Sequence, residues 1–156
     1  MHDTNARYLV CQSVASYIHS DSITYVDSRN NTAKAALAGV WQRVINVAEA
    51  DLCVKVDVRE QQALCYVPQA SSTEAAIMEY LGNQSAFALA GIEHATATTK
   101  SVLLSVALRH IDIKTAALAA SIESTIMLPK IDENPDAQIL RESLKCDLAL
   151  AKIIMM

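Results

Sequence analysis

Two cysteines and two histidines are the side chains in this sequence that could carry out chemistry together. A thiolate beside an imidazole can act as a nucleophile, and the two kinds of group can also bind zinc. Cys53 and Cys65 lie in segments that could pair across a hairpin, whereas His94 and His110 fall in an apolar stretch. The cysteines of the chain show no CxxC pair and no Cys/His spacing suited to zinc. Buried thiols and core histidines therefore explain these residues better than catalysis does.

Other catalytic patterns are also missing from the sequence. The three glycines are isolated from one another, so there is no glycine-rich phosphate loop. The carboxylates are scattered over predicted helix ends and loops, where the helix dipole and solvation account for them. We therefore predict that the protein is not an enzyme and uses neither a metal nor a cofactor. A small helical enzyme that combines one of the two cysteines with one of the two histidines is the third alternative.

Five basic residues could bind the phosphates of a nucleic acid. At 100° per residue, Arg141, Lys145 and Lys152 fall within about 40° of one another on a helix. Arg29 and Lys34 flank the start of another predicted helix. A row of charges most often only solvates a helix face, and aromatic side chains that would stack on bases do not accompany these residues. Phosphate contact at the five positions is therefore a prediction that competes with simple solvation.

Composition limits the kind of molecule that carries these residues. The 156 residues are 52% hydrophobic and 19% charged, which predicts one ordered globular domain over 1–156. Abundant alanine with scarce glycine and proline favours packed helices. The net charge of −4 excludes a broad nucleic-acid footprint and leaves only a local basic patch. Because neither a secretory signal nor an apolar run of ~18 residues is visible, we expect a cytoplasmic protein with reduced thiols.

The first third of the chain predicts two helices separated by a short apolar segment. Apolar residues recur at helical spacing over 4–19, and again over 37–52. Trp41, the single tryptophan, falls in the middle of the second apolar face and is predicted to anchor the core. The segment 23–27, which reads ITYVD, fits either a strand or a hydrophobic loop held against the core.

A change of period after the second helix predicts a β-hairpin over 53–67. In 53–59 the valines alternate with charged residues, which is typical of a half-exposed strand. The apolar segment 63–67 would return beside it and end at Pro68. A hairpin alone is marginally stable, so we expect it to pack on the helices or on a partner.

The long apolar stretch from Phe87 to Leu128 is the predicted spine of the protein. Threonines weaken helix propensity near its middle, so we expect breaks near Thr98 and Asp112. A short helix should precede it, opened by the capping box Ser71-x-x-Glu74 and ended by Gly82.

The last helix is predicted to begin at Pro135, after an Asn134 cap. It is apolar on two sides: Leu140, Leu144, Leu148 and Ala151 share one face, and Ile139, Cys146, Leu150 and Ile154 lie nearly opposite. Such a helix is either sandwiched within its own chain or binds another chain, so this prediction stays open.

The order of these elements resembles the small subunit of the archaeal type I-A CRISPR interference complex, Cascade. A helix leads into the segment ITYVDSRNN at 23–31, followed by an alanine-rich helix, a hairpin insertion and further alanine-rich helices. The resemblance runs from Tyr8 to Met127 and includes the Tyr-Val-Asp sequence at 25–27. It implies a non-enzymatic, self-associating subunit that packs along the crRNA-bound backbone and helps to hold target DNA.

The predicted architecture is therefore mainly α, a helical bundle with a small β-hairpin insertion. The predicted function is that of a structural subunit in a crRNA-guided ribonucleoprotein complex of antiviral defence. Its expected partners are the other subunits and, through a local basic patch, crRNA or target DNA; no membrane is expected. A self-assembling helical scaffold without nucleic acid is the alternative.

Overall fold

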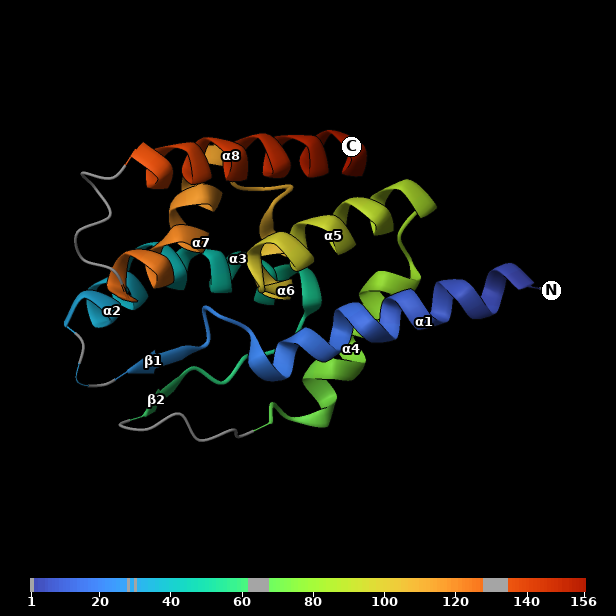
Figure 1. Cartoon of the computed structure of the whole chain (residues 1–156). Coiled ribbons are helices and arrows are strands. Elements are labelled where there is room, and N and C mark those ends of the chain that lie inside the picture. The colour runs from blue at the N-terminus through green and yellow to red at the C-terminus, as the bar shows by residue number, and fades with distance from the viewer. Residues whose placement is uncertain (1, 28, 30, 62–67, 128–134) are drawn as a thin grey trace.

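The computed structural model describes residues 2–27, 29, 31–61, 68–127 and 135–156. Helices dominate it, as predicted (Figure 1). The helices are α1 (His2–Ser16), α2 (Asn31–Ala36), α3 (Gln42–Leu52), α4 (Ser71–Gly82), α5 (Ala86–Thr99), α6 (Val102–Ala107), α7 (Ile113–Met127) and α8 (Pro135–Met155). A 3-10 turn, Tyr17–Ser20, continues α1, and a π-helical segment, Leu37–Trp41, joins α2 to α3. Two short strands, β1 (Tyr25–Asp27) and β2 (Arg59–Gln61), complete the described elements.

Helix α6 lies at the centre of the packing. All six of its residues are buried, and it packs against α3, α5 and α7. Helix α8 lies along α5 and also touches α7, while α1 packs against α4 and α5 (Figure 1). The alanine-rich spine is therefore covered by other helices of the same chain on several sides.

The breaks predicted in the spine are confirmed. Helix α5 ends at Thr99, and Lys100 adopts a left-handed φ of 58° that turns the chain. Ser101 then caps α6, because its hydroxyl accepts a hydrogen bond from the Leu104 N–H at 3.0 Å. The second predicted break, at Asp112, precedes α7, which starts at Ile113.

The predicted capping box does not form, although the helix it was meant to open does. The N-cap of α4 is Ala70, which has no side-chain cap. The Ala70 carbonyl accepts the Thr73 N–H at 2.9 Å. The Glu74 carboxylate is directed to His19 instead, at 3.1 Å. Tertiary contact has replaced the local cap, while Gly82 ends the helix as expected.

The predicted strand over 53–59 is wrong for residues 53–58, which form no strand. Their amides are satisfied by side chains: the Val56 N–H donates to Glu49 Oε1 at 2.9 Å, and the Asp57 N–H donates to Gln69 Oε1 at 3.1 Å. Strand β2 starts only at Arg59 and pairs in parallel with β1, in the register Tyr25 to Arg59. The strand alternative for 23–27 is thus confirmed for 25–27, since residues 23 and 24 lie in a turn, whereas the returning strand predicted at 63–67 lies outside the described residues.

The last helix begins at Pro135, as predicted, and its inner face closes on the spine. Leu148, Ala151 and Met155 are buried there. Gly91 of α5 permits the close approach, because a Cβ at that position would lie 2.7 Å from Met155 Cγ and 2.8 Å from the Ala151 carbonyl oxygen. The open question about α8 is therefore answered for its inner face, which packs within the chain.

Replacing Gly91 by alanine is expected to lower the free energy of unfolding by about 1–3 kcal/mol, because α8 must shift away from α5 to admit the methyl group. Urea unfolding measures the change. Gly82→Ala is the matched control, since a Cβ at Gly82 would meet nothing within 4 Å. Equal stabilities for the two variants would contradict the close contact between α5 and α8.

Candidate functional site

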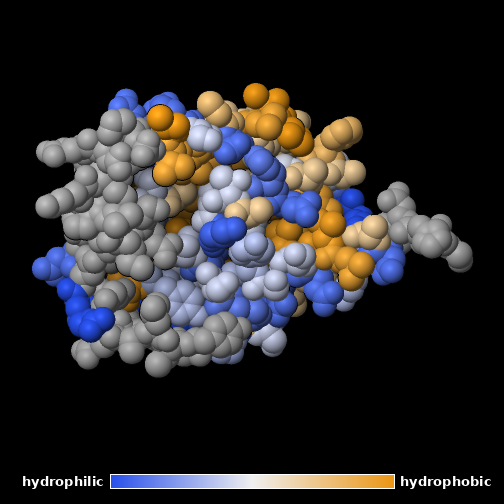
Figure 2. Space-filling model, viewed as in Figure 1, coloured by the Kyte–Doolittle hydropathy of each residue, from blue (hydrophilic) through white to orange (hydrophobic). Residues whose placement is uncertain are grey.

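The outer face of α8 carries a row of exposed apolar side chains. Ile139, Leu150 and Ile153 are exposed by 66%, 51% and 70%. Cys146 is exposed between them. These four residues are spaced by seven, four and three positions, so they share one face of the helix, and we call them the α8 stripe. Figure 2 shows groups of hydrophobic residues along the upper edge of the molecule, over α8, with hydrophilic residues between them.

The sequence-based assignment of the two faces of α8 needs two corrections. Leu140 was predicted on the inner face with Leu148, but it is 70% exposed. Ile154 was predicted on the outer face, but it is half-buried, and its neighbour Ile153 is exposed instead. The seven-residue spacing from Ile139 through Cys146 to Ile153 is the signal that groups these residues on one face, although it does not tell which face is exposed.

Two further exposed apolar residues lie in the first turn of α5 and directly after α8. Phe87, in the first turn of α5, is 77% exposed, and Met156 is 95% exposed. The first half of α5 faces the last turns of α8, because Gly91 contacts Ala151 and Met155. Exposed apolar side chains from two helices therefore lie at one end of the α5–α8 pair. Exposed apolar patches are a feature from which a protein-interaction site can be argued.

The five predicted phosphate-binding residues do not gather at one site. Lys152 donates to the Ile111 carbonyl at 2.5 Å, and Lys145 pairs with Glu142 at 2.6 Å. Arg141 is half-buried on the same helix. Arg29 and Lys34 are exposed near the start of α2. Two of the α8 cations thus act within the chain, and phosphate contact at the five positions stays a prediction.

The candidate cysteine and histidine chemistry is not assembled in the described part of the chain. His94 faces Asp147 of α8 at 3.7 Å, and His110 pairs with Asp51 of α3 at 3.0 Å. Cys53 is exposed after α3, and Cys65 lies outside the described residues. Among described residues, no group of three or more His, Cys, Asp or Glu side chains could hold a metal ion. Each histidine thus lies beside a carboxylate of another helix, and not beside a cysteine thiol of the described residues.

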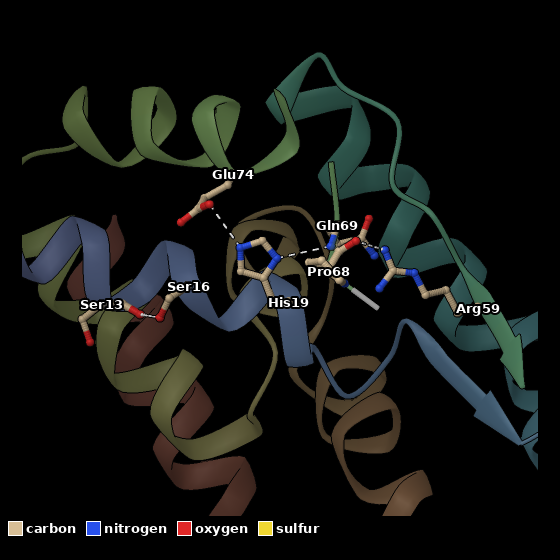
Figure 3. A network of polar contacts seen from close by, with 7 residues as sticks. All are labelled: Ser13, Ser16, His19, Arg59, Pro68, Gln69 and Glu74. Atoms are coloured by element: carbon tan, nitrogen blue, oxygen red, sulfur yellow. Dashed lines mark hydrogen bonds and ion pairs between the residues drawn. The ribbon is translucent and has the colours of Figure 1, made fainter. Parts of the chain in front are cut away.

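A polar network joins the 3-10 turn after α1 to α4 and β2 (Figure 3). His19 lies between the Glu74 carboxylate, at 3.1 Å, and the Gln69 N–H, which donates to Nδ1 at 3.2 Å. Arg59 donates to the Pro68 carbonyl at 2.5 Å and to the Tyr25 hydroxyl at 3.1 Å. The partners of His19 and Arg59 include main-chain groups of the segment before α4, so the network holds that segment in place.

Solved structures share this helical arrangement over nearly the whole chain. One is Atp12 from Paracoccus denitrificans, which matches with a TM-score of 0.81 at 17% identity over 95% of this chain and 64% of that one. A point mutant of the same protein matches equally well, over 94% and 63%. The Agrobacterium tumefaciens protein Atu1473, described as a candidate chaperone, has a TM-score of 0.80 at 20% identity, over 96% and 56%. The chain thus has the fold of these proteins and spans less than two thirds of their length.

These matches overturn the resemblance to the CRISPR small subunit. The predicted roles in a crRNA-guided complex, in antiviral defence and in binding crRNA or target DNA are therefore wrong. Element order misled because short helices and a β segment recur in unrelated folds, whereas the three-dimensional packing of the helices is specific. The scaffold alternative is nearer to what these proteins are described as doing, but it is not a chaperone role either.

In comparisons of the sequence, no protein-family model and no curated protein matches this chain. Among the described helices, none combines the length and the apolar character needed to cross a membrane.

Proposed function

We propose that this protein is an assembly chaperone that binds an unassembled client subunit and keeps it in solution. The observation that carries the proposal is the fold, which matches Atp12 and a candidate chaperone with TM-scores of 0.80–0.81. The exposed apolar residues of α5 and α8 support it, because a chaperone needs surface that can cover apolar surface of a client. Such a protein acts by binding rather than by catalysis.

We further propose that the client is a subunit of ATP synthase. Atp12 is a chaperone for the assembly of that complex. A subunit that awaits its partners exposes the apolar interfaces that the finished complex will bury. A chaperone that covers such an interface prevents aggregation and gives the subunit up when the correct neighbour arrives. The acidic net charge of −4 helps to keep the chain–client complex soluble.

Dilution of an unfolded client tests the proposed function. Head subunits of a bacterial ATP synthase, unfolded in guanidinium chloride, are diluted into buffer with and without the chain, and light scattering is followed. We expect the scattering of at least one subunit to fall as the chain approaches an equimolar amount, because a stoichiometric complex forms. Serum albumin is the control for nonspecific protection. Scattering that is unchanged for every subunit would rule out the proposed function.

A further inference from the structure

The α8 stripe favours a partner segment of one secondary structure, a helix, over an extended segment. The N–H and C=O groups in the middle of α8 are used within the helix, so its surface offers side chains but no main-chain hydrogen bonds. An extended segment docked there would leave its own backbone groups without partners. A helix brings its backbone hydrogen bonds with it. The spacing of Ile139, Cys146, Leu150 and Ile153 matches helix-to-helix packing over roughly 20 Å, at 1.5 Å per residue.

The charges beside the stripe indicate which helix would fit. Residues three or four apart are neighbours on a helix surface. By this measure Glu142 adjoins Cys146 and Ile139, and Asp147 adjoins Leu150. No lysine or arginine of α8 stands three or four positions from a stripe residue. By this spacing, the charges of α8 that adjoin the stripe are therefore carboxylates.

Two of the three basic residues of α8, Lys145 and Lys152, bond to groups of the same chain. Lys152 holds the Ile111 carbonyl at 2.5 Å, and Lys145 bonds to Glu142 at 2.6 Å on the side of α8 away from Asp147. Arg109 of the turn after α6 reaches back to the Met155 carbonyl at 3.1 Å. Two cation–carbonyl bonds thus fix the C-terminal half of α8 to the body of the protein. The stripe is presented on a rigid helix, which lowers the entropic cost of binding.

We propose that the α8 stripe is the client-binding face, and that it takes an amphipathic helix of the client with lysine or arginine beside its apolar side chains. This inference rests on the proposed chaperone function. The apolar side of the client helix covers Ile139, Leu150 and Ile153, and its basic residues meet Glu142 and Asp147. A second copy of this chain fits less well, because pairing two stripes face to face would bring their flanking carboxylates together.

The exposed cysteines of the chain provide matched positions for a test by photocrosslinking. Cys146 lies within the stripe, and Cys53 is exposed at the end of α3. Two full-length variants each keep one of these cysteines, with the other three replaced by alanine, and each carries a benzophenone group on its thiol. Each variant is irradiated with the head subunits of a bacterial ATP synthase diluted from guanidinium chloride, and crosslinked peptides are identified by mass spectrometry.

We expect the group at Cys146 to crosslink the client in high yield and the group at Cys53 in low yield. The crosslinked client peptides should come from helices that carry lysine or arginine. Glu142→Gln together with Asp147→Asn should weaken client binding about five- to tenfold and reduce its salt dependence. Leu9→Lys on α1, which changes a residue that is 55% exposed, should leave it unchanged.

Three outcomes would overturn this inference. If the chain prevents client aggregation but crosslinks through Cys53 as well as through Cys146, the surface is wrong and the chaperone function stands. If Cys146 crosslinks chiefly to a second copy of the chain, or to acidic client segments, the assigned occupant is wrong. If the unmodified chain does not prevent aggregation at all, the proposed function itself fails.

Discussion

Replacing Trp41 by alanine is expected to lower the free energy of unfolding by about 3–5 kcal/mol. The indole is 2% exposed, at the junction of the π-helical segment and α3. Its Nε1–H donates to the Ala119 carbonyl of α7 at 2.9 Å. Alanine would leave a cavity between the two helices and remove this bond. Urea unfolding followed by circular dichroism measures the loss.

The variant Trp41→Phe separates the two contributions. Phenylalanine keeps most of the apolar volume but cannot donate to Ala119, so a smaller loss of about 1–2 kcal/mol is expected. Trp41 was predicted to anchor the core from its central place on an apolar helix face, and its burial confirms this. A loss below about 1 kcal/mol for the alanine variant would contradict that role.

The second large effect is a pH dependence of stability that comes from Asp21. This residue is fully buried in the turn before β1. Its carboxylate accepts the Leu103 N–H at 3.0 Å and the Ile23 N–H at 3.2 Å. Burial raises the pKa of Asp21 from 3.8 to about 6, although these backbone hydrogen bonds oppose the increase. The folded protein therefore holds a proton on this carboxyl more tightly than the unfolded chain does.

The raised pKa of Asp21 in the folded state sets the direction of the pH dependence of stability. Protonation of Asp21 favours the folded state, so its contribution to stability is complete below pH 3.8 and is lost as the pH rises through about 6. A difference of about two pKa units corresponds to about 3 kcal/mol. The free energy of unfolding of the wild type, relative to Asp21→Asn, should fall by about that amount between pH 4 and pH 7.

Urea titrations at several pH values measure this difference. The comparison with Asp21→Asn isolates one residue, because the other titrating groups are common to both proteins. Parallel pH profiles for the two proteins would contradict the raised pKa. A wild type that gains stability relative to the variant as the pH rises would show that the hydrogen bonds from Leu103 and Ile23 outweigh burial.

Local periodicity and caps account for the elements that could be predicted from the sequence. The apolar face around Trp41, the threonines before Lys100 and the start at Pro135 each act within a few residues, so they specify α3, the break after α5 and the beginning of α8. The mainly helical composition is predictable for the same reason.

Long-range contacts account for the elements that could not be predicted. The valines of 53–58 alternate like a strand, yet the amides of Val56 and Asp57 bond to the side chains of Glu49 and Gln69. Strand β2 pairs with β1, which lies about thirty residues earlier in the chain. Local sequence patterns do not predict a pairing between segments so far apart.

The candidate site was predictable only in part. The sequence indicates that α8 is apolar on two sides, but only packing against α5 decides which side remains exposed. Gly91 permits this packing because it has no Cβ. The sequence does not show this role, because it does not show that Ala151 and Met155 lie against Gly91. The basic residues of α8 share a helix face in the sequence, whereas the bond of Lys152 to the Ile111 carbonyl, 41 residues away, becomes visible only in the fold.

The mass of a complex between the chain and a client tests most directly whether the protein holds an unassembled client, as we propose. The chain, of 16.9 kDa, is mixed with each head subunit of a bacterial ATP synthase and passed over a sizing column with light-scattering detection. We expect one subunit to elute together with the chain, with a mass equal to their sum. Separate elution of the chain and every subunit, each at its own mass, would contradict the proposed chaperone function.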